Sequence, residues 1–178
     1  SCLDHLNPGI SSQQIQELFE AIPLQLTQDL RALYTWRNGS KDSEGITLGE
    51  LAFFPGFYLM SLEESIQTYQ ELRETSTWNQ CWFPIFANGG GDFYAVNLAI
   101  EAQGEIIGYY IYEEEPQIEY NSLESMLQTF NECYKQGIIF QNEQGYLDMD
   151  YRKHAEIAHD INPEVKIWLE FLKETEEE

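Results

Sequence analysis

Apolar residues recur at helical spacing in four stretches of the chain, and each stretch is bounded by residues that start or stop helices. Ser11 with Gln14 and Ser61 with Glu64 resemble capping boxes, in which two side chains satisfy free backbone amides at a helix start. Gly39 and Gly137 are typical of helix ends, because glycine adopts a positive φ without steric cost. These signals predict helices over residues 11–22, 24–39, 61–75 and 122–137.

The middle of the chain changes from helical spacing to the pattern of strands. Two apolar pieces within residues 51–60 flank Pro55 and Gly56 and are typical of short strands. Residues 82–87 are apolar throughout, whereas residues 93–98 alternate. The pattern predicts strands over residues 82–87, 93–98 and 105–112, with turns at 88–91 and 103–104. Successive strands joined by short turns predict an antiparallel meander.

The chain beyond Gly137 predicts a short apolar piece over 138–140, a polar stretch and two helices on either side of Pro163. Helical and strand segments are segregated along the sequence, which favours an α+β fold over an alternating α/β fold. We expect a single domain over residues 11–136, built as a mainly antiparallel meander flanked by helices. We expect residues 137–178 to form a C-terminal helical extension that packs on the same domain.

The composition indicates a folded, strongly acidic protein. The 178 residues are 43% hydrophobic and 14% aromatic, enough to form a core, and 31 acids against 9 bases give a net charge of -22. This charge argues against direct binding of nucleic acid or of an anionic membrane surface, and it favours a basic protein partner. Three scattered cysteines do not form a disulfide framework, so we expect a cytoplasmic protein. No stretch has the length of an apolar membrane span.

Few residue patterns in the chain suggest chemistry, and we expect no catalytic residue, metal site or cofactor. Residues 88–92 are glycine-rich but lack the Lys-Ser/Thr of a phosphate-binding loop and precede a strand, so a hairpin turn is the better interpretation. His154 and His159 are five residues apart, which separates them around a helix, and we expect both to be solvated. Asp148 and Asp150 resemble the start of a calcium loop, but basic residues follow them.

The most partner-like feature is a tyrosine-rich strand end followed by a run of acids. Tyrosines offer rigid contact area with a polar tip, and neighbouring carboxylates would attract a basic partner. An ordinary strand followed by a solvated acidic loop is the alternative. The partner-binding candidates are these residues together with Asp92 of the glycine-rich turn: Asp92, Tyr109, Tyr110, Tyr112, Glu113, Glu114 and Glu115.

Three stretches resemble the SUKH superfamily, which includes fungal cell-wall assembly regulators and many bacterial immunity proteins. Residues 23–39 carry the pattern Pro-Leu-x-Leu-x-x-x-Leu-x-x-Leu-Tyr-x-x-x-Asn-Gly. A predicted strand leads into Ser-Leu-Glu-Glu at 61–64, and residues 82–94 read Trp-Phe-Pro-Ile-Phe-Ala-Asn-Gly-Gly-Gly-Asp-Phe-Tyr. The resemblance covers roughly residues 11–135 and does not extend beyond about residue 137.

The resemblance implies an α+β domain that binds another protein and has no catalytic role. Bacterial members commonly neutralise a toxin domain, often a nuclease, whereas the fungal members act as signalling scaffolds in cell-wall synthesis. A basic toxin domain is therefore the expected partner. A signalling scaffold related to the cell-wall regulators is the alternative.

Overall fold

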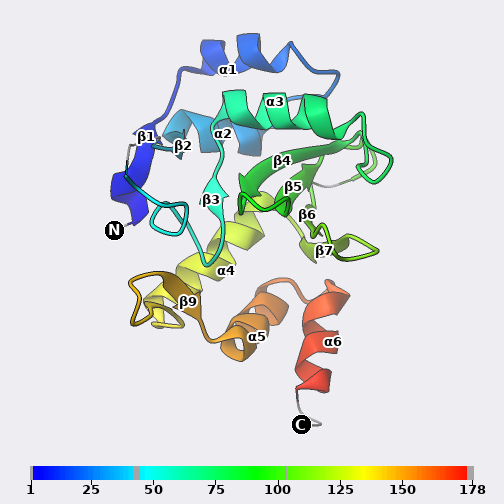
Figure 1. Ribbon diagram of the computed structural model, residues 1–178. Helices are drawn as coiled ribbons and strands as arrows, with labels where there is room; N and C mark the ends of the chain where they lie inside the picture. The colour runs from blue at the N-terminus through cyan, green and yellow to red at the C-terminus, as the bar shows by residue number, and fades with distance from the viewer. Residues whose placement is uncertain (1, 42–44, 103, 176–178) are drawn as a thin grey trace.

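The computed structural model describes residues 2–41, 45–102 and 104–175 (Figure 1). The helices are the 3-10 helix η1 (Cys2–His5) and the α-helices α1 (Ser12–Phe19), α2 (Gln28–Trp36), α3 (Leu62–Leu72), α4 (Leu123–Lys135), α5 (Tyr151–Ile161) and α6 (Lys166–Glu174). The strands are β1 (Leu6–Pro8), β2 (Arg37–Ser40), β3 (Tyr58–Leu59), β4 (Trp82–Ala87), β5 (Phe93–Asn97), β6 (Ile106–Tyr109), β7 (Gln117–Tyr120), β8 (Ile139–Gln141) and β9 (Leu147–Met149).

The main sheet is an antiparallel meander in the order β3-β4-β5-β6-β7. Phe93 of β5 pairs with Ala87 on one side and with Tyr109 on the other, which fixes the register of three consecutive strands. The register of β4 shifts between Pro84 and Phe86. A bulge suits this position because proline has no amide hydrogen for the ladder. The architecture confirms the predicted α+β class and the predicted meander.

The core is one buried cluster that joins the sheet to the helices. It includes residues of α1, α2, α3, α4 and α5 together with side chains of β4, β5, β6 and β7. Phe54 lies at its centre and stacks on Phe130 of α4, with ring centroids 4.1 Å apart. In Figure 1, α1 and α3 lie above the sheet, whereas α4, α5 and α6 lie below it.

The starts of α1 and α3 are capped by the serines that the sequence suggested, but only the capping box of α1 is complete. Ser11 and Gln14 make the complete capping box of α1. Ser61 accepts a hydrogen bond from the amide of Glu64 at 3.1 Å and so caps α3. The Glu64 carboxylate accepts instead from the Tyr58 hydroxyl at 2.6 Å, which ties β3 to the start of α3.

The prediction of one helix over residues 24–39 was wrong at both ends, because α2 is shorter and is followed by strand β2. Asn38 is buried, and its side-chain oxygen accepts from the amide of Leu62 at 2.8 Å. Gly39 has a φ of 78°, and a side chain there would overlap the backbone of Ser61. The Asn-Gly pair therefore packs against the start of α3 and does not end α2.

The strand predictions need three further corrections. The piece expected over residues 105–112 forms a strand only to Tyr109, because residues 110–116 turn toward β7. Strand β7 itself was not predicted. Within residues 51–60, only Tyr58 and Leu59 form a strand, and a single β-bridge joins Phe54 to Phe57.

The C-terminal part contains the two predicted helices on either side of Pro163 and a β8–β9 hairpin, of which only the first strand was expected. Helix α5 packs on α4, and α6 packs on α5 and β7. The indole nitrogen of Trp168 in α6 donates to the carbonyl of Glu119 in β7. The division of the chain at residue 137 remains a prediction. Among the described residues, no helix combines the length and apolarity needed to cross a membrane.

Candidate functional site

The tyrosine and glutamate run lies on the connection between β6 and β7. Tyr112 is 97% exposed, and Glu113, Glu114 and Glu115 are also exposed. The amide of Glu113 donates to the carbonyl of Tyr110 at 3.0 Å, which makes a tight turn. The structure therefore gathers one tyrosine and three carboxylates at one accessible place, which we call the acidic edge (residues 112–115).

The other two tyrosines of the predicted site point back into the protein. Tyr109 is half-buried, packs edge-on against Trp78 with ring centroids 5.1 Å apart, and shares a hydrogen bond with the Thr77 hydroxyl. Tyr110 is half-buried, and its hydroxyl donates to Glu119 at 2.7 Å. These contacts hold the base of the β6–β7 connection, and the side chain of Tyr112 projects beyond it.

A buried carboxylate that sequence reasoning missed anchors this base. Glu119 is 3% exposed and accepts hydrogen bonds from Tyr110 on Oε1 and from Tyr94 on Oε2, the latter at 2.8 Å. The Tyr94 and Tyr110 hydroxyls also lie 3.0 Å apart. Burial raises the pKa of Glu119 to about 7, although the two tyrosine hydrogen bonds act in the opposite direction. Burial likewise raises the pKa of Tyr94 and of Tyr110.

Gly108 makes room for this carboxylate. It lies in β6, and a side chain at this position would overlap the Glu119 carboxylate and crowd the Tyr110 ring. A glycine inside a strand often marks such a close approach. Gly108 was therefore a signal in the sequence for a group packed closely on this strand.

Asp92 acts at the same base from the neighbouring turn. Its Oδ1 accepts from the amide of Ile111 at 2.9 Å, and its Oδ2 accepts from the Asn88 side chain at 2.6 Å. The Asn88 side-chain oxygen in turn accepts from the amide of Gly90 at 2.7 Å. Asp92 therefore ties the glycine-rich turn to the β6–β7 connection, and this geometry gives it a positioning role beneath the acidic edge.

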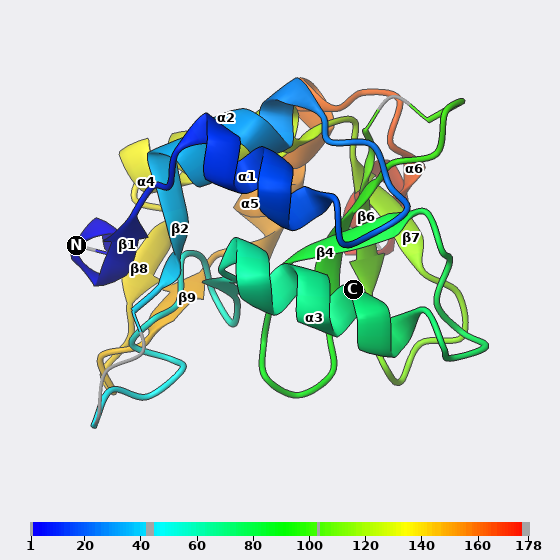
Figure 2. The ribbon, with the colours of Figure 1, turned by 90° about the horizontal axis from the view of Figure 1, so that it is seen from above.

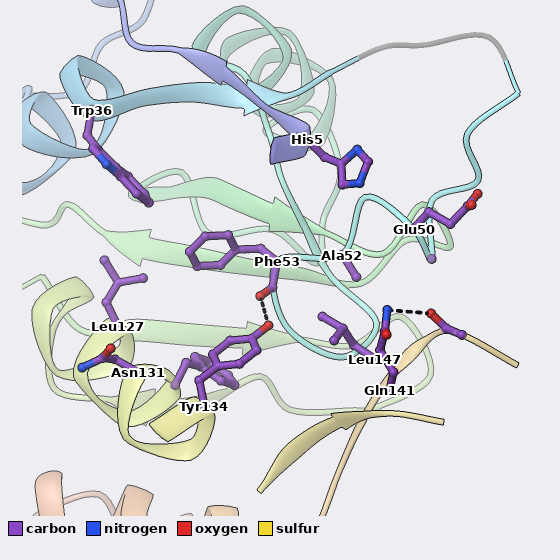
Figure 3. A pocket seen from close by; sticks show the side chains of 13 residues that line it. His5, Trp36, Glu50, Ala52, Phe53, Leu127, Asn131, Tyr134, Gln141 and Leu147 are labelled. Carbon is purple, nitrogen blue, oxygen red and sulfur yellow. Dashed lines mark hydrogen bonds between the residues drawn. The ribbon is translucent and has the colours of Figure 1, made fainter. Parts of the chain in front are cut away.

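A hollow of about 840 Å³ lies on another part of the molecule, between α4, the end of α2, residues 49–53 and the β8–β9 hairpin (Figure 3). In Figure 3, Trp36, Phe53 and Tyr134 group toward one end, and His5 and Glu50 lie toward the other. The Tyr134 hydroxyl donates to the carbonyl of Phe53 at 2.7 Å and so fixes one wall. Sequence reasoning did not find this hollow, because its walls come from five separate segments.

A second hollow of about 500 Å³ continues the first one between α2 and α4. The two hollows share Trp36, Leu127 and Asn131. We call the combined depression the α2–α4 groove. Figures 1 and 2 both place β9, which lines one end of the groove, on the opposite side of the molecule from β6 and β7, so this end of the groove and the acidic edge lie on different sides.

The prediction that His154 is solvated was wrong. His154 is 3% exposed, its Nε2 lies 3.1 Å from the Tyr120 hydroxyl, and its ring stacks on Phe130. Burial lowers the pKa of His154 to about 4, so the ring is neutral at neutral pH. Among the described residues, no group of three or more His, Cys, Asp or Glu side chains could hold a metal ion.

The motifs that suggested a family are joined in the structure. The Asn-Gly pair of the first stretch packs on the Ser-Leu-Glu-Glu start of α3, and the third stretch forms β4, the glycine-rich turn and the start of β5. No curated protein matches the chain. Residues 9–129, more than half of the chain, match the SMI1 / KNR4 family (SUKH-1). The chain is therefore a member of the SMI1 / KNR4 family (SUKH-1), a family of regulator-like and immunity-like domains.

Proposed function

We propose that this chain is a non-catalytic protein-binding domain, and specifically an immunity protein that binds a basic toxin domain in the cytoplasm and holds it inactive. Membership of the SUKH-1 family supports the protein-binding role in general. The observation that carries the specific proposal is the acidic edge, together with the net charge of -22. A tyrosine that is 97% exposed beside three exposed carboxylates is suited to a basic surface.

A nuclease is the toxin class that these features fit best. Nucleases bind a phosphate backbone, and the groove that does so is basic. An acidic protein can occupy such a groove in place of the nucleic acid, and long-range attraction accelerates the encounter. The association rate should therefore fall steeply as salt rises, because salt screens charges over about 10 Å at 0.1 M.

The first test is an affinity capture from lysate of the native organism with the full chain, eluted in steps of rising salt. One basic protein with a toxin-like domain, whose activity is lost on addition of the chain, supports the proposal. A partner whose association rate does not change with salt contradicts the electrostatic part. Several unrelated signalling or cell-wall proteins, captured without inhibition, would favour the scaffold alternative.

The second test removes the acidic edge while keeping the fold. Tyr112→Ala should weaken binding of the captured partner, and Ile100→Ala is its matched control, because Ile100 is 95% exposed on the β5–β6 connection. Replacing all three glutamates of the acidic edge by glutamine should slow association. The matched control replaces three exposed glutamates elsewhere, Glu20, Glu101 and Glu174, and has the same net charge. Equal effects of the two triple variants would exclude the acidic edge as the contact.

A further inference from the structure

The α2–α4 groove has an apolar floor made by matching stripes on two helices. On α2, Leu33 and Trp36 form this floor, and Asp29 lies one turn before Leu33 on the same helix face. On α4, the stripe runs from Leu123 through Leu127 to Tyr134. Eleven steps along α4 at 1.5 Å per residue give the groove a length of roughly 16 Å. This length matches about three turns of a helix or five residues of extended chain.

Part of this floor is exposed to solvent. Trp36 is 41% exposed and Tyr134 is 36% exposed, although both carry large rings. The Trp36 ring packs edge-on against Phe53, with centroids 6.3 Å apart, which holds it in place on the floor. Exposed aromatic side chains inside a depression are typical of sites that anchor a partner.

The borders of the groove carry negative charge. Asp29 and Glu124 lie in the first turns of α2 and α4, and Glu50 lies at the far end beside the β8–β9 hairpin. The described residues that line the two hollows include no Lys or Arg. Arg37, which is not among them, lies over the Trp36 ring at 5.3 Å from its centroid. The first-turn acids also stabilise their helices, but that role does not require them to border an apolar groove.

We propose that the α2–α4 groove binds a basic amphipathic segment of the partner protein, with apolar side chains on the floor and Lys or Arg side chains at the acidic borders. The inference rests on the proposed function in that the partner is basic, and it adds a second contact surface away from the acidic edge. Amphipathic helices commonly bind in this way, with apolar side chains at helical spacing that enter an apolar groove of the receptor. A second copy of this chain is a poorer occupant, because two proteins with a charge of -22 repel each other.

The groove is tested with a defined probe, a fluorescent 14-residue peptide with Leu on one helical face and Lys on the other. Two control peptides replace all Lys by Glu or all Leu by Ser. Fluorescence anisotropy should show binding of the Leu/Lys peptide, with both controls at least about tenfold weaker, which corresponds to about 1.4 kcal/mol. Absence of binding, or equal binding of the Ser-containing peptide, overturns the inference.

Two variants of the full chain locate the peptide. Trp36→Ala removes the central anchor, and the double variant Asp29→Lys with Glu124→Lys reverses two border charges. Each should weaken the Leu/Lys peptide about tenfold. The controls are Tyr151→Ala, an aromatic residue that is 56% exposed and outside the groove, and Glu20→Lys with Glu101→Lys, which has the same net charge. If the two charge-reversal variants weaken binding equally, net charge alone holds the peptide and the inference is overturned.

The same variants separate this inference from the proposed function. A captured toxin that still binds both groove variants with unchanged affinity overturns the groove and leaves the immunity role intact. If no basic protein is captured or inhibited, the immunity role fails. Peptide binding that depends on Trp36 and on the border charges would then still support the groove as a site for basic segments.

Discussion

Glu119 and His154 are buried ionisable groups whose effects on stability oppose each other. The pKa of Glu119 is about 7 in the folded protein against an ordinary 4.5, so between these pH values the folded state holds a proton that the unfolded chain has released. The free energy of unfolding therefore falls as pH rises through this window. At about 1.4 kcal/mol per pH unit, the full effect is about 3 kcal/mol.

His154 has the opposite sign. Burial lowers its pKa to about 4 from an ordinary 6.5, so between these values the unfolded chain holds a proton that the folded state lacks. The free energy of unfolding therefore rises with pH through this window, again by about 3 kcal/mol in full. The two windows overlap between pH 4.5 and pH 6.5, and in the wild type the two slopes largely cancel there.

The perturbation is Glu119→Gln, whose amide can still pair with the two tyrosine hydroxyls. Urea unfolding is measured between pH 5 and pH 8. This range lies above the sequence pI of about 4.2, the pH at which the protein is least soluble. The free energy of unfolding of the variant minus that of the wild type should rise by about 2.5 kcal/mol from pH 5 to pH 8. For His154→Gln the same difference should fall by about 2 kcal/mol.

The control is Glu115→Gln, which removes one exposed carboxylate. It measures how the loss of a single negative charge alone changes the free energy of unfolding. Comparing each variant with the wild type also cancels the contribution that repulsion among the other acidic groups makes to the free energy of unfolding, because both proteins share it. A Glu119→Gln difference that is flat with pH would refute the reasoning, since it would mean that the carboxyl ionises equally easily in the folded and unfolded states.

Two further substitutions and one labelling experiment test other parts of the structure. Gly108→Ala should destabilise the protein by roughly 1–3 kcal/mol in urea unfolding, because the new methyl group overlaps the Glu119 carboxylate. Phe54→Ala should cost about 3–5 kcal/mol in the same assay, because it removes the ring that stacks on Phe130 at the core centre. Cys133 should resist iodoacetamide in the native protein, as followed by peptide mass spectrometry, because burial raises the pKa of its thiol to about 11.

Matched controls accompany these changes. Gly90→Ala adds the same methyl group at a position where it would make only ordinary van der Waals contacts. An equal loss of stability in Gly90→Ala and Gly108→Ala would therefore contradict the overlap with the Glu119 carboxylate. Phe140 is 47% exposed, and Phe140→Ala should cost much less than Phe54→Ala. For Cys133, labelling should become complete in urea, and rapid labelling of the native protein would contradict its burial.

Local signals in the sequence were sufficient for much of the fold. Ser11 and Ser61 cap the helices that their positions predicted, because a capping side chain acts within its own turn. The strands β4 and β5 and the glycine-rich turn between them also follow from short-range patterns. Residues that are close in sequence determine these features, and a sequence pattern carries this local information.

The errors occurred where distant contacts decide the structure. Strand β7 has its polar Glu119 buried and its apolar Ile118 44% exposed, the reverse of the usual alternation, because Tyr94 and Tyr110 supply partners for the carboxylate. Gly39 is typical of a helix end, but here the Asn38-Gly39 pair packs on the start of α3, where the Asn38 side chain accepts from the amide of Leu62. The acidic edge was visible in the sequence as one run, whereas the α2–α4 groove was not, because it combines segments far apart along the chain.

The separation of the two surfaces implies different kinetic roles for them. Charge acts at long range and governs the association rate, whereas buried apolar anchors govern how long a complex lasts. Neutralising the acidic edge should therefore slow association with the captured partner and reduce its dependence on salt, with little change in dissociation. Trp36→Ala should accelerate dissociation and leave the salt dependence of association unchanged. Stopped-flow measurements of both rates at several salt concentrations distinguish the two effects, and a Trp36→Ala variant that slowed only association would show that the groove does not anchor the partner.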